Sequence, residues 1–321
     1  MSHVIVSGAN GFVGRALCRA LIDAGHRVTG LVRRPGGCID GVTEWVDSSA
    51  DYVDTLTAWP PDLKADCLVH LASRVHVMKD DAPDPGAAFR ATNVEGTLRL
   101  ATSAQRHGVS RFVFVSSIKA AAERGHGRPL REDDQAQPED AYGRSKRSAE
   151  EALVRFGDAS GSEIVIVRPP LVYGPHVRAN FLRLMDAVWR GVPLPLGAIE
   201  ARRSMVYVRN LADALVRCAT DPRAAGQCFY VADNDALTVA QLVRLLARHL
   251  GKPSRTLPVP ASLLRILGRL TGRSPQIDRL IGDLQVDTSH IRQTLGWQPP
   301  FSTDEGLSAT ADWYRSTHST L

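Results

Sequence analysis

The chain has 321 residues, of which 44% are hydrophobic and 23% are charged, and its formal net charge is +5. This length suffices for one large α/β domain, or for a domain with a smaller lobe, and for a sizeable buried core. The arginines are scattered and form no basic run with interleaved aromatic residues, which argues against nucleic-acid binding. A diffuse positive charge would still favour an anionic small molecule such as a nucleotide.

The five cysteines include no C-x-x-C pair, so the sequence predicts neither a disulfide framework nor a metal site. The first residues enter an apolar strand without a signal-peptide pattern. No apolar stretch approaches the ~20 residues that cross a bilayer. We expect a soluble cytoplasmic protein with no membrane partner.

The first predicted elements are a strand over 3–7, a glycine-rich turn and a helix over 15–24. The turn reads Gly8-Ala9-Asn10-Gly11-Phe12-Val13-Gly14. Glycines permit close backbone approach and positive φ, while the free N–H groups and the dipole of the following helix would face a pyrophosphate. An ordinary tight turn is the alternative. The predicted dinucleotide contacts come from Gly8, Asn10, Gly11, Phe12, Val13 and Gly14, of which Gly14 would let the helix lie close to the strand.

The second predicted strand, 27–32, is followed by Arg33 and Arg34. An acidic residue at this place would accept hydrogen bonds from a ribose 2′-hydroxyl, whereas an arginine attracts a 2′-phosphate. The arginines favour NADP over NAD, although they could also stack on adenine or be solvated. A weaker strand, 43–46, leads to Asp47, which either reaches the adenine amino group or is a plain loop aspartate.

Strands and helices then alternate. Further strands are expected at 66–72, 111–115 and 163–168, and helices at 87–107, carrying Asn93 after a loop with Pro83, Pro85 and Gly86, and at 141–156. Such alternation predicts right-handed crossovers and a Rossmann-type doubly wound parallel sheet. Because ligands bind beyond the carboxyl ends of such strands, Ser116 and Ser117 should face the same crevice as the glycine turn.

The composition of the sequence changes after Pro169-Pro170, where proline and glycine become frequent. We expect a dinucleotide-binding domain over 1–168 that resumes at about 205–233, through a helix at 210–220 and a strand at 227–231. A smaller lobe would comprise 169–204 and 234–321. Within it, Thr238 should cap a helix that runs to Leu250, and another helix should span 261–270.

Tyr142 and Lys146 stand four residues apart, on one face of the predicted helix 141–156. Taken alone, this spacing fits a packed tyrosine and a solvated lysine equally well. Its context is more specific. The Tyr142-x-x-x-Lys146 pair follows the glycine turn, His70-Leu71-Ala72, Asn93 and Ser117, and it precedes Arg168-Pro169.

Together these motifs resemble the extended short-chain dehydrogenases/reductases over nearly the whole chain. The stretches Leu171 to Pro175 and Arg203 to Ala214 look like the nucleotide-sugar epimerase and reductase branch. Ser116-Ser117-Ile118-Lys119 is similar to a surface-polysaccharide subgroup described as UDP-glucose 4-epimerase-like. The chain departs from that pattern at Ala120-Ala121-Ala122, where relatives often carry a V-N-G or V-Y-G turn.

The resemblance implies the site residues. Tyr142 would be the acid/base, Lys146 would favour its phenolate and hold the nicotinamide ribose, and Ser117 would orient the sugar. Further cofactor contacts would come from Leu71, Ala72, Ser73, Asn93, Ser116, Pro169 and Val172. The nucleotide diphosphate would lie against Asn180, Arg203 and Arg279. A homodimer would form through the helices carrying Asn93 and Tyr142.

Three functions stay open from the sequence. A C4 epimerase of a UDP- or dTDP-hexose keeps its cofactor, usually NAD, bound through a 4-keto intermediate. A 4-keto-sugar reductase instead uses external NADPH and needs the same catalytic residues. A non-catalytic NADP-binding sensor would be expected to lose the tyrosine, lysine or serine, and this chain retains all three.

Overall fold

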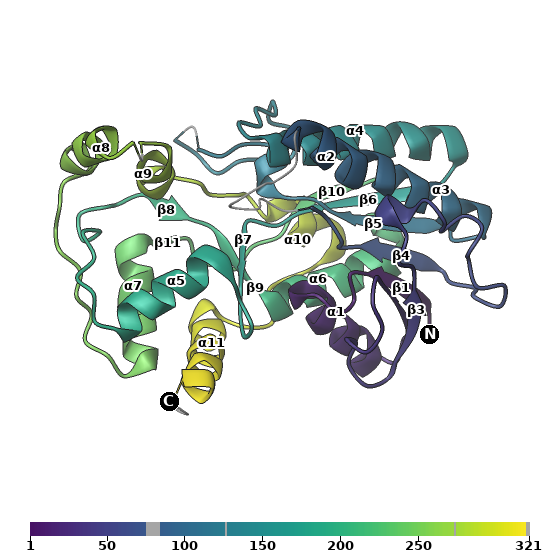
Figure 1. Ribbon diagram of the computed structural model, residues 1–321, viewed down its shortest axis with the longest axis horizontal. Coiled ribbons are helices and arrows are strands. Elements are labelled where there is room, and N and C mark those ends of the chain that lie inside the picture. Colours follow the sequence, from purple (N-terminus) through teal and green to yellow (C-terminus); the bar gives the residue numbers. More distant parts are fainter. Residues whose placement is uncertain (75–83, 126, 273, 319–321) are drawn as a thin grey trace.

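The computed structural model describes residues 1–74, 84–125, 127–272 and 274–318, and a seven-stranded sheet lies at its centre (Figure 1). All neighbouring strands of this sheet are parallel, in the order β10-β6-β5-β4-β1-β2-β3. The strands are β1 His3–Ser7, β2 Arg27–Val32, β3 Val42–Val46, β4 Cys67–His70, β5 Arg111–Val115, β6 Glu163–Arg168 and β10 Cys228–Tyr230. The chain reverses direction across the sheet between β1 and β4, which makes a topological switch point there.

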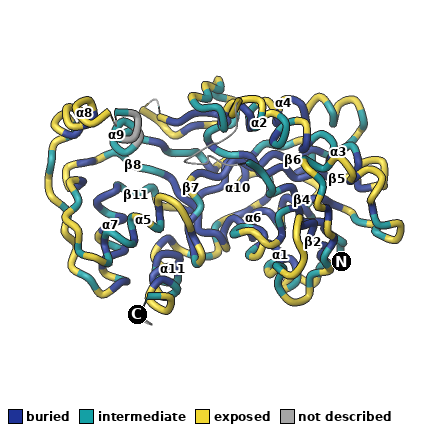
Figure 2. The backbone as a smooth tube through the Cα atoms, in the orientation of Figure 1, coloured by how far each residue is buried: buried dark blue, intermediate teal, exposed yellow. Residues whose placement is uncertain are grey.

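Helices cover both faces of the sheet. Val4 and Val6 of β1 pack in the core under α1 (Phe12–Asp23) and α6 (Val208–Thr220), while Ile5 points to the opposite core. That second core lies under α3 (Thr97–Arg106) and α4 (Ala141–Ser160). Figure 2 shows the central strands β4, β5 and β6 buried between the two layers. The predicted doubly wound Rossmann-type sheet is therefore confirmed.

A smaller lobe with its own core adjoins the carboxyl ends of the strands (Figure 1). Its elements are α5 Ala179–Trp189, β8 Arg202–Arg203, β11 Leu237–Thr238, α7 Val239–Leu250, α8 Ala261–Leu270, α9 Ser274–Ile281 and α11 Thr303–His318. As predicted, Thr238 caps α7, in a capping box with Gln241. The pair β7 (Leu171–Tyr173) and β9 (Met205–Tyr207) lies between this lobe and the sheet, and α10 (Ser289–Leu295) packs beside β10.

The predicted helix 87–107 is wrong in detail, because three helical segments occupy this part of the chain. They are α2 Pro85–Arg90, a π-helical segment η2 Ala91–Gly96 that carries Asn93, and α3. Pro85 and Gly86 form the first turn of α2 instead of a loop, since Asp84 caps the helix and proline is tolerated at its first position. Pro83 lies outside the described residues.

Helix α4 runs to Ser160, beyond the predicted end at Phe156. Gly157 does not end the helix, because it is helical, and a Cβ there would lie 2.7 Å from Ile164 Cγ1. The helix ends at Gly161, which has φ of +73°.

A buried carboxylate joins the end of the sheet to the smaller lobe. Asp233 follows β10 and accepts hydrogen bonds from Tyr173 Oη at 2.8 Å and Asn210 Nδ2 at 2.7 Å. Its Oδ1 also accepts from the Tyr207 N–H at 3.0 Å. Asn210 in turn bonds both backbone groups of Phe301. One side chain thus ties β7, β9 and α6 together at the boundary between the two cores.

The turn between β1 and α1 is closely packed against the start of the helix. Gly8 has φ of +72°, and a Cβ on Gly14 would lie 2.1 Å from the Gly8 carbonyl oxygen. Gly14 therefore lets α1 lie directly on the turn that follows β1, and the predicted contact is with this turn instead of the strand itself. Gly11 precedes the helix with an extended backbone, and no side chain caps the first turn.

We expect Gly14→Ala to lower the free energy of unfolding by about 1–3 kcal/mol or more, because α1 must move away from the turn. Chemical denaturation followed by circular dichroism would measure the loss. Arg19→Ala, at an exposed position of the same helix, is the matched control and should change stability by less than about 0.5 kcal/mol. Equal stability of the two variants would contradict the close contact.

Candidate active site

The glycine turn forms the floor of a site at the carboxyl ends of β1 and β4. A Cβ on Gly8 would lie 3.3 Å from the backbone nitrogen of Ala72, so the loop after β4 rests on the turn. The first N–H groups of α1, those of Phe12, Val13 and Gly14, are left without a side-chain cap. Free donors at a helix start, reached over glycines, fit the pyrophosphate of a dinucleotide.

A buried hydrogen-bond chain fixes the loop over the turn. Ser7 Oγ accepts from the N–H groups of Leu71 and Ala72, at 3.2 and 3.4 Å, and lies 2.6 Å from His70 Nδ1. Thr97 Oγ1 donates its proton to the Asn93 carbonyl at 2.7 Å and so accepts from His70 Nε2 at 3.1 Å, which leaves His70 Nδ1 to accept the serine proton. Burial, and then the charge of Lys146, lower the His70 pKa to about 3, so the ring stays neutral. No local pattern in the sequence marks Ser7 as a site residue, although its partners lie in the His70-Leu71-Ala72 motif.

Asn93 links this loop to α4. Its Oδ1 accepts from the Arg74 N–H at 2.8 Å, and its Nδ2 donates to the Arg74 carbonyl at 3.0 Å and to Ser145 Oγ at 2.9 Å. Both amide protons are thus used within the protein. Asn93 holds Ser73 beside the start of α4, and the cofactor contact predicted for Asn93 stays a prediction.

Tyr142 lies in the first turn of α4, with its ring 6.2 Å from that of Phe89. Burial raises the pKa of its phenol to about 12, and the charge of Asp140 acts in the same direction. Hydrogen bonding with Ser73 and Ser117 lowers this pKa in part. The predicted residues Ser73 and Ser117 therefore both lie against the Tyr142 phenol. Unless a further cation lowers its pKa, this phenol is protonated at neutral pH.

Lys146 lies one turn along α4 with its side chain 2% exposed. Its Nζ donates to the Val115 carbonyl at 2.8 Å and stands 4.4 Å from the centre of the Phe114 ring. Burial lowers the Lys146 pKa to about 7, against the charge of Glu150. Glu150 itself forms a buried ion pair with Arg168, at 2.7 Å from Nη2 to Oε2. The solvated-lysine interpretation of this helix is therefore wrong.

Ser116 and Ser117 follow β5 and differ in their environment. Ser117 Oγ accepts from the Lys119 N–H at 3.2 Å and caps the short helix η3, Ile118–Ala120. The Ser116 hydroxyl is buried and has no hydrogen-bond partner among the residues that the structure describes. An orphaned buried hydroxyl at this sheet edge fits a polar group of a bound dinucleotide. Pro169, after β6, accepts from the Ile118 N–H at 3.0 Å, and Val172 lies half-buried in β7.

The outer end of the glycine turn is bordered by Arg33 and Arg34, which are both exposed after β2. The next residues form a loop whose N–H groups, those of Gly36, Gly37 and Cys38, donate to the Glu44 carboxylate at 2.8–3.1 Å. Asp47 accepts from the Ser49 N–H at 2.9 Å and from Thr55 Oγ1 at 2.5 Å. Its adenine contact stays a prediction beside this structural role.

The predicted substrate residues belong to the smaller lobe. Asn180 is exposed at the start of α5, and Arg203 is half-buried on β8, where its Nη1 donates to the Gly282 carbonyl at 3.0 Å. Arg279 lies in α9, and its side chain is outside the described part of the chain. The structure thus brings Ser73, Ser117 and Tyr142 together and places Lys146 one turn along α4.

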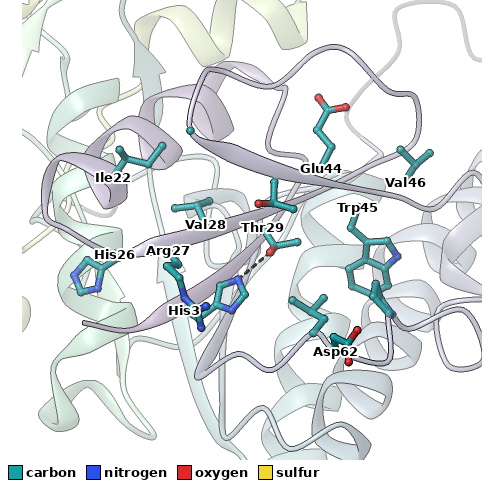
Figure 3. Close-up of a pocket in the computed structure, with 14 residues that line it drawn as sticks. His3, Ile22, His26, Arg27, Val28, Thr29, Glu44, Trp45, Val46 and Asp62 are labelled. Carbon is teal, nitrogen blue, oxygen red and sulfur yellow. Dashed lines mark hydrogen bonds between the residues drawn. The ribbon is translucent and has the colours of Figure 1, made fainter.

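A hollow of about 560 Å³ lies elsewhere, around the outer edge of the sheet (Figure 3). His3 and Arg27, the first residues of β1 and β2, line it, and His3 Nε2 lies 2.8 Å from Thr29 Oγ1. No predicted site residue lines this hollow. Within the described ranges, the structure also contains no cluster of metal-ligating side chains and no helix long and apolar enough to span a membrane.

A glycine turn at a sheet switch point, with a serine, a tyrosine and a buried lysine beyond the strand ends, defines a nicotinamide-dinucleotide enzyme of the short-chain dehydrogenase/reductase type. The chain matches the NAD dependent epimerase/dehydratase family over residues 4–232, and it belongs to that family. The resemblance seen in the sequence is therefore confirmed, and so is a nicotinamide cofactor, NAD by the family's description.

Individual relatives cover nearly the whole chain. A UDP-glucose 4-epimerase of Vibrio cholerae is 42% identical over 96% of this chain and 94% of its own length. A 4-epimerase of N-acetyl-α-D-glucosaminyl-diphospho-ditrans,octacis-undecaprenol from Escherichia coli O157:H7 is 26% identical over 97% and 95%. A Thermotoga maritima UDP-glucose 4-epimerase, solved with UDP-glucose, is 23% identical and shares the fold with a TM-score of 0.78 over 98% and 99% of the two chains.

The buried ammonium gives a prediction about stability. The unfolded lysine binds its proton up to an ordinary pKa near ~10.4, whereas the folded one releases it near pH 7, so stability should rise with pH between these values. Lys146→Met should flatten this rise and increase the melting temperature at pH 7, while turnover is lost. Scanning calorimetry at several pH values would measure it. Arg155→Met, an exposed change on the same helix, should alter neither property.

Proposed function

We propose that this protein is a nucleotide-sugar C4 epimerase that acts on a UDP- or dTDP-hexose through a 4-keto intermediate. The observation that carries the proposal is the placement of Ser117 against Tyr142, with Lys146 one turn away, over a dinucleotide cradle. The 42% identity to the Vibrio cholerae UDP-glucose 4-epimerase supports epimerisation in particular. The suggested place in surface-polysaccharide precursor synthesis rests on the Ser116 to Lys119 resemblance.

The glycine turn would hold the nicotinamide dinucleotide, which would supply reversible hydride transfer, so that C4 of the sugar could be oxidised to a ketone and reduced again on its other face. Tyr142 would accept the C4 hydroxyl proton in the first half and give it back in the second. Ser117 would hold the reacting oxygen beside that phenol. The Lys146 ammonium would favour the phenolate, whose pKa of about 12 in the free protein is otherwise too high for a base.

The nucleotide diphosphate would be held in the smaller lobe by Asn180, Arg203 and Arg279. An arginine suits this role because its guanidinium pairs bidentately with phosphate oxygens. A homodimer through the helices that carry Asn93 and Tyr142 is part of the same proposal.

The decisive test supplies the purified protein with UDP-glucose, UDP-N-acetylglucosamine or dTDP-glucose and no added cofactor. We expect the protein to interconvert C4 epimers with the dinucleotide that it already carries. Chromatography of the nucleotide sugars would measure this interconversion. Turnover of a 4-keto sugar that strictly requires stoichiometric NADPH would instead identify a reductase. Dinucleotide binding without turnover of either kind would identify a sensor.

Tyr142→Phe should abolish epimerisation, by about 10²-fold or more, because the proton has no acceptor at the phenol position. Dinucleotide affinity should stay within about threefold, since the ring and the glycine turn are retained. Fluorescence titration with NADH would measure that affinity alongside the chromatographic assay. Unchanged turnover in this variant would contradict the assignment of Tyr142.

The cofactor preference is tested at the end of β2. Arg33→Ala combined with Arg34→Ala should weaken NADP binding by about 10-fold or more and leave NAD binding nearly unchanged, because only NADP carries the 2′-phosphate. Calorimetric titration with both dinucleotides would show the difference. An equal effect on the two cofactors would assign the arginines to adenine stacking or to the solvated surface.

A further inference from the structure

Beyond the predicted triad, one lysine contacts both sides of the site. The backbone N–H of Lys119 donates to Ser117 Oγ at 3.2 Å, and its ammonium donates to Asp140 Oδ2 at 2.6 Å. Asp140 uses its other oxygen, Oδ1, to cap α4 by accepting from the Gly143 N–H at 2.7 Å. Lys119 therefore links the segment that carries the serine to the first turn of the helix that carries Tyr142.

The short helix η3, which contains Lys119, is packed directly against the first turn of α4. A Cβ on Gly143 would lie 2.4 Å from the Lys119 carbonyl oxygen, so only glycine lets η3 lie against the start of α4. The ion pair is also sheltered, with the Asp140 side chain 16% exposed and that of Lys119 31% exposed. Glu123 is buried behind them, with Oε1 3.5 Å from the same ammonium.

The ion pair also affects the charge at the phenol. Asp140 lies two residues before Tyr142, and its negative charge raises the Tyr142 pKa. The Lys119 ammonium balances that charge and, with the Gly143 N–H, holds the pKa of Asp140 below its ordinary value despite burial. The groups that face the phenol or this ion pair are Ser73, Phe89, Ser117, Lys119, Glu123 and Asp140.

We propose that Lys119 is a positioning residue of the active site, which acts through Asp140 to hold Tyr142 against Ser117 and to offset the carboxylate charge beside the phenol. Lys119 need not touch the sugar or the cofactor for this role. The inference rests on the proposed function insofar as turnover is its readout, and it also makes a prediction that needs no substrate.

The experiment compares Lys119→Met, Lys119→Arg and Asp140→Asn in the full chain loaded with NAD. Lys119→Met should lower kcat by about 10- to 100-fold with little change in KM, because the reacting groups are misplaced while the sugar-binding lobe is intact. The acid limb of its kcat profile against pH should move to higher pH by about one unit. The negative charge of Asp140, no longer balanced by the lysine, would raise the Tyr142 pKa. Lys119→Arg should restore most of the turnover.

Asp140→Asn keeps a side-chain oxygen for the cap but removes the negative charge, so its acid limb should move to lower pH. Opposite displacements in the two variants distinguish charge balance from simple loosening of the fold. Arg124→Met breaks the exposed Arg124–Glu139 pair nearby, at 3.5 Å, and should displace neither limb. Displacements of the same sign in Lys119→Met and Asp140→Asn, or none in either, would overturn the proposal.

A spectroscopic titration separates this proposal from the function. The ultraviolet absorbance of phenolate is followed against pH in NAD-loaded protein, and the curve of the Tyr142→Phe variant is subtracted so that only Tyr142 remains. The Tyr142 pKa should rise in Lys119→Met and fall in Asp140→Asn even if no nucleotide sugar is turned over. If the wild type epimerises sugars but these pKa values do not move, the proposed function stands and the role of Lys119 is wrong.

Discussion

Burial of the Lys146 ammonium is the constraint on which the geometry of the site depends. An ammonium removed from water is costly unless partners surround it, and here the Val115 carbonyl, the Phe114 ring and the charge of Glu150 do so. These partners come from β5 and from α4 itself. Placing the charge therefore fixes α4 across the carboxyl end of β5, which brings Tyr142 to the edge where Ser117 emerges.

The same region of the site determines the protonation state of the Tyr142 phenol. In the free protein, burial and the charge of Asp140 raise the Tyr142 pKa to about 12, so the phenol is neutral. Once the cofactor is in place, a cationic nicotinamide would add to the charge of a protonated Lys146 in favouring the phenolate. The contact of Lys119 with Asp140 reduces the opposing charge beforehand. Proton transfer would thereby be coupled to cofactor binding through electrostatics alone.

Two backbone contacts at which only glycine fits set the remaining distances. Gly14 brings α1 onto the Gly8 carbonyl, and Gly143 brings α4 onto the Lys119 carbonyl. The first contact aims free N–H groups at the place of a pyrophosphate, and the second joins the serine and tyrosine segments. Any larger residue would separate the two helices from the strand ends. At the boundary with the smaller lobe, the hydrogen bonds of Asp233 with Tyr173 and Asn210 fix the distance between β7 and α6.

The sequence by itself determined the parallel sheet, most of its strands, the glycine turn and the tyrosine–lysine pair, because these depend on local periodicity and on short motifs. It placed β1, β5 and β6 at their observed residues, since each is a short apolar run with a clear end. Only the tertiary structure decided that Lys146 is buried, that η2 interrupts a helix around Asn93, and that Ser7, Asp140 and Lys119 support the site. Those features depend on contacts between residues far apart in the chain, such as Ser7 and His70, whose sequence separation is 63. No local sequence pattern predicts such contacts.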